Sequence, residues 1–112
     1  MTGHAPVYLQ IRAALTAAII EGRHNDGDPL PSVRALASRH HANPLTVAKA
    51  YQVLQEEGVV VVKRGVGMFV APGARRRLRA TERRIFLEER WPAILGDIRR
   101  LELDPAELLE TD

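Results

Sequence analysis

Apolar residues recur at helical spacing in three successive stretches of the chain. The first helix is expected at 8–21, and it is followed by Gly22, a residue typical of helix ends. Its apolar stripe is Tyr8, Ile11, Leu15, Ala18 and Ile19. A second helix is expected at 33–39 and a third at 44–57, which ends before Gly58. The spacing therefore predicts three amphipathic helices before residue 58.

Capping residues mark where the second and third helices begin. Ser32 can accept a hydrogen bond from a first-turn amide. Asn43 can do the same, and Pro44 fits the first helical position, where its missing N–H costs nothing. The two helices are separated by a short turn, His40-His41-Ala42. This arrangement predicts a helix-turn-helix.

The periodicity changes after the third helix. Residues 59–62 are all valine, which favours a buried strand over a surface helix. Gly65 and Gly67 follow in a turn, and residues 68–70 return as the partner strand. A hairpin directly after a helix-turn-helix predicts a wing, and we expect this domain to end at residue 72.

The remaining residues are expected to form a helical dimerisation tail. Pro92 interrupts this tail, so that the helix either kinks or ends there and a new one begins. Asp104 and Pro105 signal a last short helix. The apolar residues alternate in spacings of four and three, which is typical of a coiled-coil-like seam: Leu87, Trp91, Ile94, Ile98 and Leu101.

The predicted fold class is therefore mainly α with a small β-hairpin. A winged helix-turn-helix occupies residues 1–72, and a helical dimerisation tail occupies residues 73–112.

The distribution of charge along the chain is more informative than the formal net charge, which is only +2. Between Arg75 and Arg84 six arginines face a single acid, Glu82, whereas the end of the chain is acidic. This asymmetry suggests a basic surface near the middle of the chain, turned away from an acidic end. The alternative is that each arginine is only solvated on a helix face.

The sequence offers little for catalysis or for metal ions. It has no cysteine, and His40 and His41 are adjacent without a third ligand at a recognisable spacing. Ser32 has no obvious His and Asp partners, and the Gly65–Gly67 turn lacks the setting of a nucleotide loop. We therefore expect a protein that is not an enzyme and that uses no cofactor and no metal.

Nothing in the sequence predicts a membrane segment either. No apolar run approaches the ~20 residues of a transmembrane helix. The amino terminus, residues 1–6, lacks the layout of a secretory signal. We expect a cytoplasmic protein that does not bind a membrane.

Several exposed residues could contact DNA if the third helix enters a major groove. Leu45 could touch a thymine methyl, or instead staple the turn against the preceding helix. Asn43 could contribute its amide to a base or phosphate, although capping alone explains it. Arg34 could clamp a phosphate, and Arg64 at the hairpin tip could enter the minor groove, the alternative for both being a solvated side chain.

Four linked motifs within residues 6–71 resemble the GntR family of bacterial regulators. They are PVYLQI from Pro6, LPSVRALA from Leu30, NPLTVAKAYQVL from Asn43 with Glu57-Gly58, and RGVGMFV from Arg64. The short two-helix tail is similar to that of the YtrA-type subfamily. The resemblance implies a homodimeric repressor on a palindromic operator, often at its own promoter, with neighbouring genes that frequently encode an ABC transporter.

The resemblance also carries DNA contacts onto particular positions. Two departures are visible: Ala48 stands where some relatives carry a long basic side chain, and Met68 stands where threonine is more usual. The resemblance and the residues themselves together predict a DNA-binding site. Its members are Ser32, Arg34, Asn43, Pro44, Leu45, Thr46, Lys49, Arg64, Gly65 and Gly67.

The predicted function is sequence-specific binding of double-stranded DNA by a homodimeric transcriptional regulator. An alternative is a winged-helix module that binds another protein. Salt separates the two, because DNA binding weakens steeply as salt rises. RNA is a weaker third candidate, since no aromatic platform for stacked bases is present. The sequence specifies neither a small-molecule effector nor the choice between repression and activation.

Overall fold

The computed structural model of the chain describes residues 5–110. Most of the amino terminus, where no secretory signal is expected, lies outside this range, as does the end of the predicted tail. The described residues divide into two compact units, one that ends at Leu78 and one that begins at Arg79. Each unit is described by itself below.

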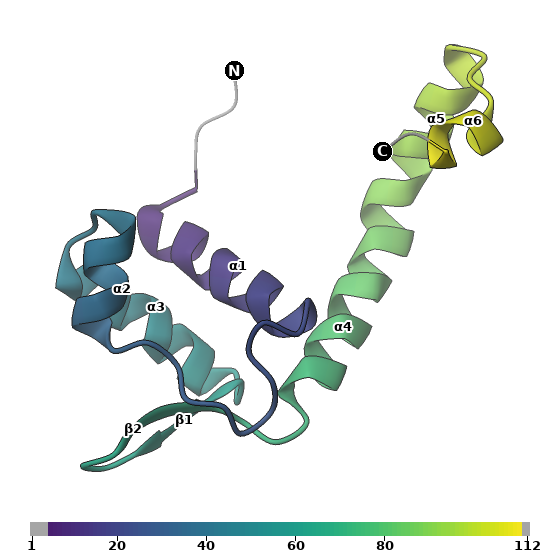
Figure 1. Cartoon of the computed structure of the whole chain (residues 1–112). Helices are drawn as coiled ribbons and strands as arrows, with labels where there is room; N and C mark the ends of the chain where they lie inside the picture. Colours follow the sequence, from purple (N-terminus) through teal and green to yellow (C-terminus); the bar gives the residue numbers. More distant parts are fainter. Residues whose placement is uncertain (1–4, 111–112) are drawn as a thin grey trace. The chain divides into compact units, whose positions relative to one another are not determined.

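The first unit contains three helices and a hairpin, which confirms the predicted fold class. The helices are α1 (Val7–Ile20), α2 (Val33–His40) and α3 (Pro44–Glu56). Strands β1 (Val60–Lys63) and β2 (Gly67–Val70) pair antiparallel, with Val60 opposite Val70 and Lys63 opposite Gly67. Figure 1 shows the hairpin extending as a narrow finger beside the three helices.

The core of this unit lies where α3 packs against α1, α2 and β1. Its largest fully buried side chains come from α1, α3 and β2, which are close in space but far apart in sequence: Ile11, Ile19, Val47, Leu54 and Val70. Burying each such side chain stabilises the fold by about 1.5–3 kcal/mol. The apolar stripe of α3 therefore faces inward, and its opposite face is left toward solvent.

The helix starts agree with the caps expected from sequence. The Ser32 hydroxyl accepts a hydrogen bond from the amide of Ala35 at 3.1 Å. The Asn43 side-chain oxygen accepts one from the amide of Leu45 at 2.8 Å. The turn between the helices is tighter than expected, since α2 continues through His40 and His41 then takes a left-handed conformation with φ 51°.

The prediction of a buried strand over the four valines at 59–62 is wrong for half of them. Val59 and Val60 are buried, but Val61 is 38% exposed and Val62 is 47% exposed. Only the base of the hairpin reaches the helical core, since Val60 and Val70 are buried there whereas Lys63 and Gly67 at the other end are exposed. The outer part of the hairpin is an exposed finger.

A third segment runs along the free edge of β2. The amide of Leu30 donates to the carbonyl of Met68, and the amide of Val70 donates to the carbonyl of Asp28. Pro29 and Phe69 form an isolated antiparallel bridge. The segment that leads into α2 is thereby fixed against the wing, which satisfies backbone groups that an open sheet edge would leave unpaired.

Helix α4 (Ala74–Ile85) begins against the first unit. The sequence places the domain boundary after residue 72, whereas the first compact unit also includes the start of α4, to Leu78. Arg75 and Arg77 bind backbone carbonyls of this unit. Both guanidinium groups therefore join the start of α4 to the rest of this unit.

The second unit continues helically past Pro92. A π-helical turn, η1 (Phe86–Arg90), leads into α5 (Trp91–Arg100), and the amide of Trp91 donates to the carbonyl of Phe86. The backbone at Arg90 and Trp91 is helical, and Pro92 falls in the first turn of α5. The chain therefore passes Pro92 through a widened turn rather than a break.

A short last helix, α6 (Pro105–Leu109), follows as predicted. The Asp104 carboxylate accepts a hydrogen bond from the amide of Ala106 at 3.0 Å, which caps the helix. Across residues 5–110, no helix is both long enough and apolar enough to cross a bilayer.

Candidate nucleic-acid interface

The outward face of α3 presents an exposed apolar residue in its first turn. Leu45 is 79% exposed, so it does not staple the turn against α2. Pro44 beside it, and Ala48 and Lys49 one turn further, are also exposed, whereas Thr46 is half-buried. Exposing an apolar side chain to water is unfavourable, and contact with a thymine methyl would remove part of that cost by burying its surface.

The two capping residues keep donors available beyond their caps. Asn43 uses its side-chain oxygen for the cap, which leaves its amide NH₂ for a base or phosphate. Ser32 accepts with its hydroxyl oxygen and can still donate the hydroxyl hydrogen. Both side chains are exposed. Their capping role therefore does not compete with a contact to DNA.

Lys49 is held in place by an aromatic ring that the sequence reasoning did not include in the site. Its ammonium nitrogen lies 4.1 Å from the centre of the Tyr8 ring, in the first turn of α1. A cation–π contact at an exposed site contributes about 0.5–1 kcal/mol. Nothing in the local sequence indicates this pairing, because Tyr8 fits equally well as part of the apolar stripe of α1.

Arg34 occupies the first turn of α2 and is exposed. Within the described part of the chain, no hydrogen bond or ion pair involves its guanidinium. A guanidinium in this state keeps all five of its donors for a phosphate or a base edge. Ser32 lies two positions earlier, so the two side chains flank the start of α2.

The wing tip combines cations with unusual backbone geometry. Arg64 is exposed, and Gly65 and Gly67 follow it with φ 77° and φ 148°. Because side chains other than glycine adopt such φ values rarely, both glycines are required by the turn. The amide of Val66 closes the turn by donating to the carbonyl of Lys63 at 2.9 Å.

Lys63 is a second wing cation, which the predicted site omits. Its ammonium nitrogen lies 4.5 Å from the centre of the Phe69 ring on the paired strand. Its position directly before Arg64 is a sequence signal that could have found it. The finger thus carries two neighbouring positive charges, which suits it to a phosphate backbone.

Tyr51 fixes α3 relative to the segment that enters α2. Its hydroxyl donates to the carbonyl of Pro31 at 2.5 Å, and the residue is only 2% exposed. Burial raises the pKa of Tyr51 to about 12, an effect that nearby Arg39 opposes. The neutral, hydrogen-bonded phenol therefore persists at ordinary pH and holds the two helices in a fixed relation.

Within residues 5–110, no group of three or more His, Asp or Glu side chains is arranged to hold a metal ion. The predicted DNA-binding residues fall on three parts of one unit: the start of α2, the first turns of α3, and the hairpin tip. Helix starts expose free N–H groups, which suit phosphate.

Three helices with a paired hairpin after the third define a winged helix-turn-helix. The chain belongs to the gntR family of bacterial regulatory proteins, because the sequence profile of that family matches residues 7–70.

Individual relatives agree with this assignment. The HTH-type transcriptional repressor YtrA of Bacillus subtilis is 41% identical over 73 residues, an alignment that covers 65% of this chain and 56% of YtrA. The chain thus spans about half the length of this curated relative.

Solved structures share the fold at lower identity. A GntR family transcriptional regulator from Listeria monocytogenes has 24% identity and a TM-score of 0.70, over 98% of this chain and 95% of that one. The DNA-binding domain of AraR, in complex with operator ORR3, has 24% identity and a TM-score of 0.61, over 63% and 86% of the two chains.

Proposed function

We propose that this protein is a sequence-specific DNA-binding transcriptional regulator that acts as a homodimeric repressor on a palindromic operator. The observation that carries the proposal is the exposed first turn of α3, where Leu45 faces solvent beside Asn43, the residue that caps the helix. Arg34 and Arg64 supply positive charge on either side of α3 in sequence. Apolar contact for specificity and cations for affinity are what a duplex requires.

Each predicted site residue then has a role. Leu45 and Thr46 contact base edges from α3, with Lys49 and Asn43 completing the reading surface. Arg34 makes a charge-assisted bond to phosphate at the start of α2. The DNA-facing set is completed by residues whose main work is to shape or cap the backbone: Ser32, Pro44, Gly65 and Gly67.

Arg64 makes the contact between the wing and DNA. A guanidinium at the tip of a narrow finger can follow the backbone into a minor groove or bind its phosphates. Lys63, fixed over Phe69, adds a second cation to the same contact.

A homodimer is supported by the apolar seam of the tail. Four of its side chains are exposed in the single chain, from 37% for Trp91 to 58% for Leu101, and Ile98 is half-buried. An uncovered apolar stripe of this kind marks a contact surface. Pairing of Leu87, Trp91, Ile94, Ile98 and Leu101 with the same residues of a second copy would cover it and match a two-fold operator.

Repression is supported by the relatives. YtrA is named a transcriptional repressor, and AraR is described in complex with an operator. A dimer seated on an operator blocks the promoter beneath it. The protein would work in the cytoplasm, where the chromosome lies, and would not be an enzyme, since the gntR family consists of regulatory proteins.

The test is selection of duplexes from a random library, followed by fluorescence anisotropy on the enriched sequence and on a scrambled control. We expect tight binding to the enriched duplex alone, falling about 10³-fold or more between roughly 50 and 200 mM salt as counterions are released. No enrichment, together with no binding to duplex at low salt, would contradict the proposal and favour a protein-binding winged helix.

A further inference from the structure

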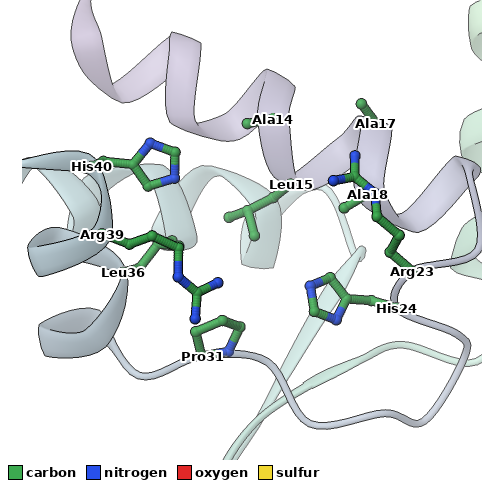
Figure 2. Close-up of a pocket in the computed structure, with 10 residues that line it drawn as sticks. All are labelled: Ala14, Leu15, Ala17, Ala18, Arg23, His24, Pro31, Leu36, Arg39 and His40. Carbon is green, nitrogen blue, oxygen red and sulfur yellow. The ribbon is translucent and has the colours of Figure 1, made fainter.

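We infer that a cavity between α1 and α2 binds a small organic anion, meaning an oxyanion group on an apolar body. The cavity has a volume of about 320 Å³ and lies within the first unit. Figure 2 shows it bounded by α1 above, by α2 on one side and by the loop after α1 on the other. None of the predicted DNA-binding residues lines it.

The floor of the cavity is apolar. Small side chains of α1 leave room there, and Leu15 lies at its centre (Figure 2). The apolar lining is completed by residues from α1, α2 and the intervening loop: Ala14, Ala17, Ala18, Pro31 and Leu36. Leu15, Ala18 and Leu36 are buried in the core, so this floor is part of the rigid framework.

The walls carry positive and hydrogen-bond-donating groups from opposite sides. Arg39 and His40 come from the end of α2, and Arg23 and His24 come from the loop after α1 (Figure 2). No carboxylate is among the lining residues. The surroundings therefore favour a negative ligand and disfavour a positive one.

Arg39 is the wall residue best placed to bind such a ligand. Arg23 is already engaged, since its guanidinium pairs with Glu21 at 2.8 Å. Arg39 has no hydrogen bond or ion pair within the described part of the chain. Its planar fork matches the two oxygens of a carboxylate or phosphate. The imidazoles of His24 and His40 can donate from the flanks in either protonation state.

The size of the cavity fits this class of ligand. A volume of about 320 Å³ is at the lower end of the range for small-molecule sites. The division into an apolar floor and a donor-bearing rim matches the usual anatomy of such sites, in which apolar area gives affinity and a few polar groups give orientation. A bare inorganic anion would leave the floor unused, and a neutral hydrocarbon would leave Arg39 unused.

The experiment is a titration followed by two-dimensional amide NMR on the whole chain without DNA, so that its outcome does not depend on the proposed function. The probes are phenyl phosphate and benzoate, with benzyl alcohol as the neutral analogue. We expect saturable shifts confined to residues 14–18, 23–31 and 36–40 for the two anions. Benzyl alcohol should bind at least tenfold more weakly.

A matched pair of variants tests the role of the cationic wall. Arg39→Gln should weaken binding of phenyl phosphate by about tenfold or more, the loss expected for one charge-assisted hydrogen bond. Arg76→Gln, which changes an exposed arginine of α4 outside the cavity, should leave it unchanged. His40→Asn provides a second test of the wall should Arg39→Gln alter the fold.

Three results would overturn the inference. The first is that neither anion produces saturable shifts at these residues. The second is equal affinity for benzyl alcohol and phenyl phosphate, which would indicate nonspecific apolar contact. The third is an equal effect of the Arg39 and Arg76 variants, which would indicate that overall charge, not the cavity, attracts the probes.

Discussion

The Nε atom of Arg75 donates a hydrogen bond to the carbonyl oxygen of Ile20, the last residue of α1, over 3.0 Å. The next arginine but one, Arg77, donates to the carbonyl of Gly58 after α3 at 2.8 Å. Helix ends leave carbonyls unpaired and carry partial negative charge, so a guanidinium satisfies both needs at once. The start of α4 thereby holds the carboxyl ends of the first and third helices.

Asp26 completes this junction from the other side. Its carboxylate accepts hydrogen bonds from the amides of Gly73 at 2.8 Å and Arg75 at 3.3 Å. The loop after α1 thus caps the start of α4, while α4 caps the end of α1. The helix that leaves the DNA-binding unit is therefore anchored to it by reciprocal bonds.

We predict that Arg75→Ala lowers the free energy of unfolding of this unit by about 1–2 kcal/mol, because a partly buried carbonyl loses a charged partner. Urea unfolding followed by circular dichroism measures the change. Arg76→Ala is the matched control, since Arg76 is exposed, and it should stay within about 0.5 kcal/mol. Equal effects of the two substitutions would contradict the proposed anchoring.

The raised pKa of Tyr51 predicts that the folded protein loses stability in alkali. Its pKa is 10.0 in the unfolded chain and about 12 in the folded one, where burial disfavours the phenolate. The unfolded chain therefore releases this proton first. The stabilising contribution is complete below pH 10 and is lost as pH rises toward 12, to a total of about 2–3 kcal/mol.

The measurement is the free energy of unfolding against pH for the wild type and for Tyr51→Phe. At neutral pH the variant should be about 1 kcal/mol less stable, because the Pro31 carbonyl loses its donor. Above pH 10 the wild-type curve should fall and cross that of the variant, ending about 1–2 kcal/mol below it. Parallel curves up to pH 12 would show that Tyr51 does not titrate as described.

The ring of Tyr8 predicts an indirect effect on DNA binding through Lys49. Tyr8→Leu removes the cation–π contact and should weaken binding to the selected duplex by about two- to fivefold, corresponding to about 0.5–1 kcal/mol. Tyr8→Phe keeps the ring and should bind like the wild type. Anisotropy at fixed salt distinguishes them, and equal losses in both variants would assign the effect to the hydroxyl instead.

Replacing Arg64 at the wing tip should weaken DNA binding in one of two distinguishable ways. Arg64→Ala should cost about 1–3 kcal/mol and relax specificity at one position if the guanidinium reads a base. It should instead reduce the salt slope by about one if it touches only phosphate. Arg99→Ala, an exposed arginine of α5, serves as the control. Unchanged binding by the Arg64 variant would exclude both roles.

The tail seam predicts the assembly state. Ile94→Asp places a charge in the centre of the apolar stripe and should give monomers in analytical ultracentrifugation, with weaker binding to a two-fold operator. Ala93→Asp introduces the same charge at the neighbouring exposed position and should leave the dimer intact. A dimer that survives Ile94→Asp would place the interface on another surface.

The elements that the sequence predicted well are those governed by neighbours along the chain. Ser32, Asn43 and Asp104 cap their helices as expected, because a capping side chain reaches only two or three residues ahead. Gly22 and Gly58 take left-handed conformations at helix ends for the same local reason. The positions of the helices, the hairpin and most of the candidate site followed from such signals.

The sequence by itself thus determined which stretches of the first unit form helices and a hairpin, where the capped helices begin, and which residues lie near the turn and the wing. Only the tertiary structure decided that Leu45 and Val62 face solvent, that Lys49 lies over Tyr8, and that Arg75 turns inward to Ile20. The last two relationships join residues far apart in the sequence, 55 positions in the case of Arg75 and Ile20, so they depend on how the helices pack and not on local backbone preference. A side chain's neighbours in space, which no local pattern encodes, determine whether it stabilises the fold or remains free to bind DNA.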